Sequence, residues 1–183
     1  MDMTEPSPLE TVPLEVERRR SIAEDAIGLR QALRRFATGV TIVTARRDDG
    51  APIGLTVNSF GSVSLDPPLV LWSLSRASPN LGAFQRAGHF AVNMLSHGQL
   101  DLARRFAAPH PDRFANLDWG RGLGEAPVIE GCAAVFECSR YAEYPGGDHA
   151  IFLGRVDRLT TADHPPLVFF DGGFCAAPSV LMP

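Results

Sequence analysis

Short apolar segments rich in β-branched residues, divided by glycine, proline and aspartate, are the feature that most constrains the fold. Segments of this kind are typical of β-strands bounded by turns. They cover Val40–Ala45, 53–65, Leu69–Leu74, His89–Ser96, 133–144, 149–161 and 166–170. Six or seven strands with few helices between them predict a mainly β protein with a closed or sandwich-like β-barrel. The chain lacks strict strand–helix alternation and has no GxGxxG motif, which argues against a dinucleotide-binding parallel sheet.

Three helices are expected. Ser21 and Glu24 have the spacing of a capping box, and we predict a helix from Ser21 that stops near Gly39. One face of that helix carries the apolar residues Ile22, Ala26, Leu29, Leu33 and Phe36. Two shorter helices are predicted. One follows Ser78, which is its N-cap, and the other covers Leu100–Phe106.

Length and composition indicate one ordinary globular domain, residues 21–183, after a disordered tail, residues 1–20. The net charge of −4 gives no basic footprint for nucleic acid or for an anionic membrane surface. No apolar run reaches the ~18–20 residues of a membrane span. The three cysteines form no CxxC, which argues against a disulfide framework or a zinc site and favours the cytoplasm.

Asp148 and His149 stand side by side after Gly146 and Gly147, a pair that suits a hydrolytic triad, a metal site or a ligand-facing loop. A triad needs a nucleophile, and the chain has no GxSxG motif. A metal site needs convergent ligands, and the five histidines show no HExxH spacing. The residues alone favour a turn role for Asp148 and a structural role for His149 over a functional one.

Two polar stretches are candidates for ligand binding. The loop from Ser75 to Asn80 offers hydroxyls, a guanidinium and a helix N-terminus, which suit a phosphate monoester; an ordinary capped surface helix is an equal alternative. The stretch 54–62 is dense in small polar residues, so its backbone could approach the edge of a flat heterocycle. A polar-faced antiparallel strand is the commoner explanation of such a stretch.

Taken in order, several motifs of this chain resemble the short-chain flavin reductase family. They extend from about Leu29 to Phe174 and include LRQALRRFATGVTIVTA, GLTVNSFGSVSLDPPLVLWSL, SRASPNL, FAVNMLS, RRFA, PDRFANLDW, GGDHAIFLGRV and PLVFFDGGF. The strand TVNSF together with the later GDH loop is the most specific part. The resemblance implies a flavin-binding split β-barrel.

The resemblance also implies roles for individual residues. The residues expected to line the isoalloxazine are Thr56, Val57, Asn58, Ser59 and Phe60. Those expected around the flavin phosphate are Ser75, Arg76, Ser78 and Asn80, with Arg105 and Phe106 also near the flavin. Gly147, Asp148 and His149 would border the nicotinamide, so that His149, the one expected catalytic residue, presents to a dinucleotide.

One stretch departs from the family. Relatives often carry an aromatic residue, a tyrosine and then a polar or basic residue where this chain has Phe169, Phe170, Asp171 and Gly172. The tyrosine hydroxyl is absent, and Asp171 would repel a pyrophosphate. Phe169, Phe170 and Gly172 are still expected to bind the cofactor, because a phenylalanine ring at this place can stack on a nucleotide.

The implied activity is that of an NAD(P)H:flavin oxidoreductase, with FMN (FAD as the alternative) and NADH (NADPH as the alternative). Hydride passes from the nicotinamide to the flavin, and a cytoplasmic homodimer would supply reduced flavin to a separate flavin-dependent monooxygenase. Two other functions stay open: a flavin-binding carrier or redox sensor, and a self-contained flavoenzyme that reduces an organic substrate. No metal, nucleic acid or membrane is expected.

Overall fold

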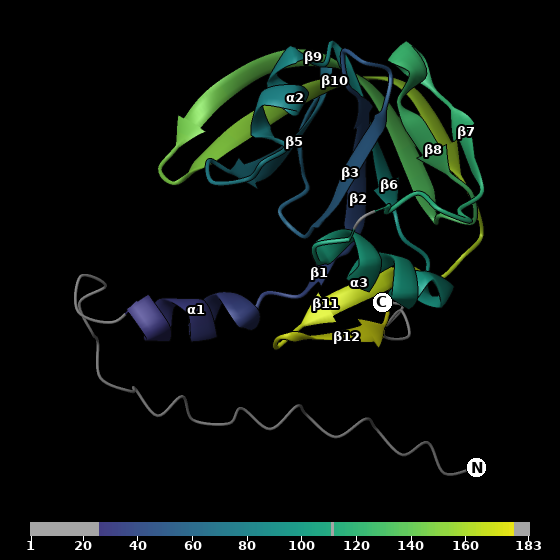
Figure 1. The fold of residues 1–183 in the computed structure, drawn as a ribbon. Coiled ribbons are helices and arrows are strands. Elements are labelled where there is room, and N and C mark those ends of the chain that lie inside the picture. Colours follow the sequence, from purple (N-terminus) through teal and green to yellow (C-terminus); the bar gives the residue numbers. More distant parts are fainter. Residues whose placement is uncertain (1–25, 111, 178–183) are drawn as a thin grey trace, which may run out of the picture. The chain divides into compact units, whose positions relative to one another are not determined.

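The structure is a computed structural model, which describes residues 26–110 and 112–177 (Figure 1). The predicted tail, residues 1–20, and the predicted helix start at Ser21 lie outside the described residues. Among the described residues, the first helix, α1 (Ala26–Arg34), belongs mostly to one compact unit, and the chain from Arg34 onward forms another. The two units are described separately.

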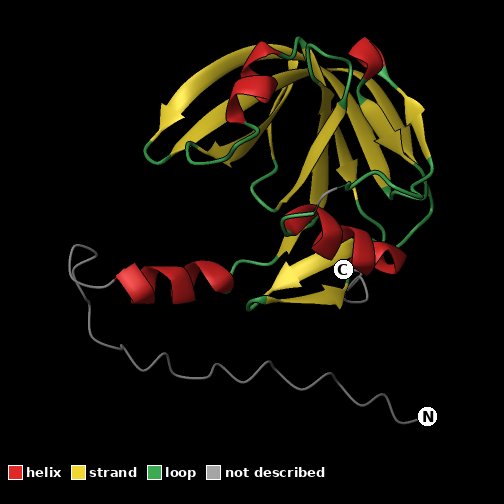
Figure 2. Ribbon diagram, in the orientation of Figure 1, coloured by secondary structure: helices red, strands yellow, loops and turns green. Residues whose placement is uncertain are grey.

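Strands dominate the unit from Arg34 onward (Figure 2). Its strands are β1 (Thr38–Gly39), β2 (Thr41–Arg46), β3 (Pro52–Val57), β4 (Gly61–Leu65), β5 (Pro68–Ser75), β6 (His89–Met94), β7 (Trp119–Arg121), β8 (Pro127–Ile129), β9 (Ala134–Gly146), β10 (His149–Thr161), β11 (Leu167–Phe170) and β12 (Gly173–Ala176). Its helices are α2 (Leu81–Arg86), α3 (Leu100–Ala107) and two 3-10 turns, His97–Gln99 and Leu123–Glu125.

Seven strands form one antiparallel sheet in the order β3-β2-β6-β9-β10-β5-β4. Its two edge strands, β3 and β4, are consecutive in the chain and are joined by only three residues, Asn58–Phe60. Such a short connection brings the two edges of the sheet together, because three residues span at most about 11 Å. The predicted mainly β fold of the barrel type is therefore confirmed.

Two apolar clusters fill the unit. Inside the curved sheet, the buried Trp72 of β5 stacks on Phe152 of β10, with ring centroids 4.6 Å apart. Phe84 of α2 and Phe90 of β6 meet the same indole edge-on, at 5.0 and 5.8 Å. The second cluster lies on the other face, where Phe106 of α3 is buried with Ile42, Leu95 and Leu167 among its members.

Several predicted boundaries are wrong. Helix α1 ends at Arg34, and Thr38 already pairs with Phe169 in a small sheet of order β1-β11-β12, because the chain after α1 gains main-chain partners there. The expected apolar face is exposed at Leu29, Leu33 and Phe36. No strand was predicted between residues 97 and 132, yet β7 and β8 lie there and form an antiparallel pair.

Helix α2 also begins later than predicted. Its N-cap is Asn80, whose side chain makes no capping hydrogen bond, and its first helical residue is Leu81. The Ser78 hydroxyl instead accepts the main-chain N–H of Asn80 at 3.3 Å, a local turn that competes with a cap. No helix among the described residues is long and apolar enough to cross a membrane.

A buried asparagine joins three strands of the unit. The Asn93 side-chain amide on β6 donates to the Ile42 carbonyl at 3.0 Å and to the Thr44 hydroxyl at 3.1 Å, both on β2. Its oxygen accepts the main-chain N–H of Ile129 on β8 at 2.8 Å. Asn93 is 0% exposed, so no water replaces these partners when the side chain is removed.

We predict that Asn93→Ala lowers the free energy of unfolding by about 2–4 kcal/mol, because it leaves the Ile129 N–H buried without a partner and opens a cavity. Urea unfolding followed by fluorescence measures the loss. Thr160→Ala, at an exposed position of β10, should change stability by less than about 0.5 kcal/mol. An equal loss of unfolding free energy in the two variants would contradict the stabilising role assigned to the Asn93 hydrogen bonds.

Candidate functional site

The free edge of β3 presents unpaired main-chain groups. Within the antiparallel pair with β2, the Arg47 N–H donates to the Ala51 carbonyl at 3.0 Å, so the odd-numbered residues of β3 face β2. The even-numbered residues Gly54 and Thr56, with Asn58 beyond, then turn their N–H and C=O groups to the open side. In agreement, the Gly54 carbonyl accepts Arg113 Nη1 at 3.2 Å. Among the described residues, nothing pairs with the N–H and C=O groups of Thr56, so they are available to a ligand.

Helix α3 covers one face of the same strand. The Thr56 hydroxyl donates to the Ala103 carbonyl at 2.7 Å. A Cβ on Gly54 would lie 2.8 Å from Cε1 of Phe106, so only glycine lets the buried Phe106 ring pack this closely. Arg105 donates from Nη1 to the Ala115 carbonyl at 3.0 Å. Phe106 therefore packs against β3, whereas Arg105 binds the loop at Ala115. A contact of either residue with a flavin stays a prediction.

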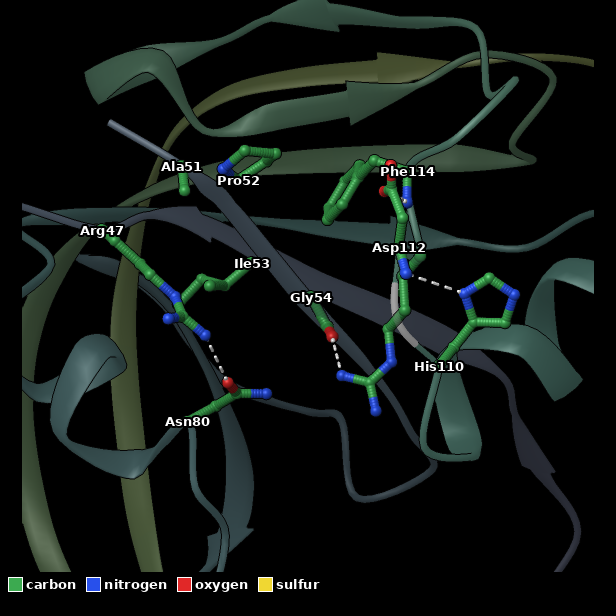
Figure 3. A pocket seen from close by; sticks show the side chains of 10 residues that line it. Arg47, Ala51, Pro52, Ile53, Gly54, Asn80, His110, Asp112 and Phe114 are labelled. Carbon is green, nitrogen blue, oxygen red and sulfur yellow. Dashed lines mark hydrogen bonds between the residues drawn. The ribbon is translucent and has the colours of Figure 1, made fainter. Parts of the chain in front are cut away.

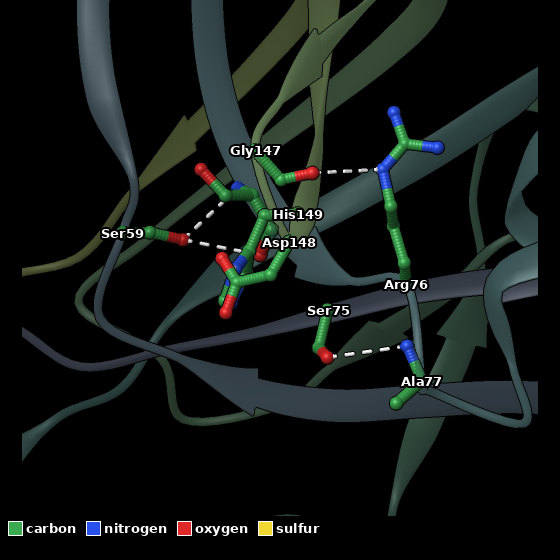
Figure 4. A network of polar contacts seen from close by, with 8 residues as sticks. Ser59, Ser75, Arg76, Ala77, Gly147, Asp148 and His149 are labelled. Carbon is green, nitrogen blue, oxygen red and sulfur yellow. Dashed lines mark hydrogen bonds and ion pairs between the residues drawn. The ribbon is translucent and has the colours of Figure 1, made fainter.

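The segment that joins the two sheet edges is anchored by Ser59. Its hydroxyl accepts the Ser73 N–H at 2.9 Å and donates to the Ser73 carbonyl at 3.3 Å, which ties the segment to β5 (Figure 4). The Phe60 ring packs against Phe136 at 5.3 Å, at the border of the inner cluster. Asn58 is exposed. Ser59 and Phe60 therefore hold the segment, and Asn58 is the polar side chain left to face a ligand.

A pocket of about 190 Å³ opens beside this segment. Thr56, Val57 and Asn58 line it on one side, and Phe169 lies on another. Val40, Ala107 and Phe174 complete the lining. The structure thus brings the TVN stretch together with Phe169, two predicted site elements more than a hundred residues apart in the chain. We call it the edge pocket.

The departure from the family at residues 170–172 is a hairpin turn. Asp171 has φ of 50° and Gly172 has φ of 83°, and Phe170 pairs with Gly173 across them. An Asp-Gly pair is the favoured sequence for a two-residue turn with both φ values positive. Phe170 is 42% exposed, whereas the Phe169 ring packs edge-on against Phe174 at 5.4 Å.

Hydrogen bonds join the two predicted nucleotide loops. His149 lies opposite Ser75 in the β5–β10 pair. The Arg76 N–H donates to the Asp148 carbonyl at 2.8 Å, and Arg76 Nε donates to the Gly147 carbonyl at 3.0 Å (Figure 4). The loop assigned to the flavin phosphate and the loop assigned to the nicotinamide are therefore neighbours.

Asp148 and His149 form an exposed pair. His149 Nδ1 lies 2.8 Å from Asp148 Oδ1. That hydrogen bond, and then the charge of His149, lower the pKa of the Asp148 carboxyl below its ordinary value of 3.8. Because the pKa of Asp148 is lowered in the folded protein, any stabilisation by the pair is fully present above pH 3.8, the ordinary pKa. It is lost as the pH falls through the lowered pKa of the folded protein. Among the described residues, no group of three or more His, Cys, Asp or Glu side chains could hold a metal ion.

A second pocket, of about 270 Å³, lies at the other end of β3 (Figure 3). Arg47, Asn80, His110 and Arg113 line it together with Asp112, Phe114 and residues 51–54. We call it the arginine pocket. Of its polar side chains only Asn80 was a predicted site residue, because Arg47 and Arg113 come from loops whose meeting no local sequence pattern indicates.

The comparisons with known proteins agree on one family. Residues 33–178 match the model of the flavin reductase like domain. The chain is 48% identical over 151 residues to an FMN reductase (NADH) of Agrobacterium fabrum, covering 82% of this chain and 86% of that one. It is 45% identical over 146 residues to the reductase component of a flavin-dependent trigonelline monooxygenase of Acinetobacter baylyi, covering 80% of this chain but only 47% of that protein.

Solved structures show the same likeness. The NADH:FAD oxidoreductase of Streptomyces globisporus, in complex with NAD and FAD fragments, matches with a TM-score of 0.82 and 37% identity. The match covers 89% of this chain and 98% of that one. The chain spans about half the length of some curated relatives, such as the A. baylyi protein, and most of the length of others.

We predict that His149→Ala raises the pKa of the Asp148 carboxyl back toward 3.8, because the two largest causes of its lowering are removed. A ¹³C NMR titration of the aspartate carboxyls measures the change. Asp157 is the internal control, because its lowered pKa comes first from the hydrogen bond with Ser139 and then from Arg155. The assigned Asp148–His149 interaction would be contradicted if the pKa of both carboxyls changed, or if the pKa of Asp148 did not change.

Proposed function

The chain belongs to the flavin reductase-like family, and from that membership we propose that it is an NAD(P)H:flavin oxidoreductase. The observation that carries the proposal is the hydrogen-bonded junction of two loops, Ser75–Asn80 and Gly147–His149, in a barrel whose β3 edge has free main-chain groups. A flavin and a nicotinamide must meet face to face for hydride transfer, and neighbouring loops satisfy that need.

The residues present fit a flavin. The edge pocket offers main-chain donors and acceptors at Thr56 and Asn58, which match the polar edge of the isoalloxazine. Ser75, Ser78 and the Arg76 guanidinium supply donors for a phosphate. When bound, the flavin supplies the hydride-accepting ring.

In this proposal the protein's own residues bind the flavin and the nicotinamide and orient the two rings. The Arg76 bonds to Gly147 and Asp148 set the position of the second loop relative to the first. The contact with Asp148 occupies His149 Nδ1 and leaves Nε2 for a ligand. His149 then orients the nicotinamide against the flavin, and Phe169 supplies an apolar wall.

The cofactor and the partners follow from the same proposal. We assign FMN as flavin and NADH as reductant, as in the name of the A. fabrum relative, with FAD and NADPH as alternatives. Reduced flavin would pass to a separate oxygenase, because relatives are named as reductase components of monooxygenases. The cytoplasm, which keeps thiols reduced, is the proposed compartment.

A homodimer is also proposed. Ile27, Leu29 and Leu33 of α1 are 73%, 39% and 63% exposed. A set of exposed apolar side chains of this size is typical of an interaction surface. A second copy of the chain is the partner that would cover it.

Steady-state oxidation of NADH, with and without free flavin, tests the activity. Activity that rises with added FMN supports the reductase. A protein that binds flavin but oxidises no NADH would be a carrier or sensor, and turnover only with an organic acceptor would indicate a self-contained flavoenzyme.

We predict that Arg76→Ala weakens FMN binding by about 1.5–3 kcal/mol, the range for a hydrogen bond to a charged group, and leaves riboflavin binding nearly unchanged. Quenching of flavin fluorescence measures both affinities. Arg86→Ala, which removes the same charge from the exposed pair with Asp48, is the matched control. An equal loss for FMN and riboflavin would mean that Arg76 acts only by holding the Gly147–His149 loop.

We predict that His149→Ala slows reduction of bound flavin by NADH about ten-fold, with flavin affinity preserved, because one orienting contact to the nicotinamide is lost. Stopped-flow absorbance at saturating flavin measures the step. His164→Ala, at an exposed histidine outside both pockets, should have no effect. A loss of flavin binding with unchanged reduction would place His149 at the flavin instead.

A further inference from the structure

The arginine pocket carries more positive than negative charge, because two guanidinium groups and one carboxylate line it. Arg47 and Arg113 both line it, and no carboxylate of the described residues lies within 4.0 Å of either guanidinium. Asp112 also lines the pocket, but its carboxylate accepts the main-chain N–H of Phe114 at 3.0 Å. The pocket therefore has an excess of positive charge and suits an anion.

Several hydrogen-bond donors in the pocket are free. Arg47 uses Nη2 for Asn80 Oδ1 at 3.2 Å (Figure 3). Arg113 uses Nη1 and Nη2 for the carbonyls of Gly54 and Ala108, at 3.2 and 2.8 Å, while its buried Nε has no partner among the described residues. His110 Nδ1 accepts the Asp112 N–H at 3.1 Å, so its Nε2 is left as a donor.

These donors match a phosphoryl group. Guanidinium groups present forked donors that fit phosphate oxygens, and several donors from separate loops can satisfy more than one oxygen. A volume of about 270 Å³ also exceeds what a single bound water or chloride needs.

The position of the pocket indicates which phosphoryl group would fit. It shares Asn80 with the loop proposed for the FMN phosphate, and it lies at the Gly54 end of β3, whereas the edge pocket lies at the Asn58 end. Four strand residues separate these ends by about 13 Å. A group bound in the arginine pocket therefore lies next to the loop proposed for the FMN phosphate, at the end of β3 away from the edge pocket.

We propose that the arginine pocket binds a phosphoryl group of an adenylate, the unit that FAD and NAD(P)H share and FMN lacks. The proposal rests on the proposed function and adds to it a subsite that distinguishes dinucleotides from FMN. Arg47 is the main contact, since its guanidinium is exposed and its one side-chain bond leaves its other donors free.

The test compares Arg47→Ala with wild type for binding of riboflavin, FMN, FAD and AMP, and for the KM of NADH and NADPH. AMP binding and that of at least one dinucleotide should weaken about 10- to 100-fold, while riboflavin and FMN change by less than about two-fold. If AMP and FAD are the only ligands whose binding weakens, the subsite belongs to the flavin. If AMP binding weakens and only the KM of NADH or NADPH rises, the subsite belongs to the reductant.

Two further variants separate charge from structure. Arg47→Gln keeps a donor for Asn80 without the charge and should behave as Arg47→Ala. Arg104→Ala removes a charge from the exposed face of α3 and should behave as wild type. Unchanged binding of AMP and every dinucleotide, equal loss for FMN and FAD, or wild-type behaviour of Arg47→Gln would overturn the proposal. If the wild type binds AMP but no flavin, the proposed function fails while the subsite stands.

Discussion

The connection from β3 to β4 is the constraint on which the rest of the structure depends. The first and last strands of the seven-stranded sheet are neighbours in sequence, so Asn58–Phe60 must bridge the two edges. Both hydrogen bonds of the Ser59 hydroxyl to Ser73 fasten that bridge to β5. Because the bridge does not pair as a strand, the β3 edge beside it keeps free main-chain groups. We propose that the flavin binds at this edge.

Long-range pairing then assembles the other parts around this edge. The β5–β10 register sets Ser75 opposite His149, and Arg76 joins the turns that follow. The pairing of β11 with β1 and β12 places Phe169 in the edge pocket. Arg113 caps the Gly54 carbonyl and marks where the free edge ends.

Most strands and the two loops could be predicted from the sequence, whereas the contacts between distant segments could not. β-Branched segments indicated most strands, and the SRASPNL and GDH motifs indicated two loops that the structure makes neighbours. The Asp171-Gly172 pair is a local signal for the turn, although these residues were considered only for their effect on nucleotide binding. The packing of Phe106 on Gly54 and the meeting of Arg47 with Arg113 depend on contacts between distant segments, which no local periodicity encodes.

The central claim is that the open edge of β3 binds the flavin ring through main-chain groups. Amide hydrogen exchange measured by NMR, with and without FMN, tests it most directly. The account predicts that FMN slows exchange at Thr56 and Asn58, whose N–H groups face the open edge, and leaves the already paired Leu55 and Val57 nearly unchanged. Protection that appears only elsewhere, for example on β7 and β8, with Thr56 and Asn58 unaffected, would contradict it.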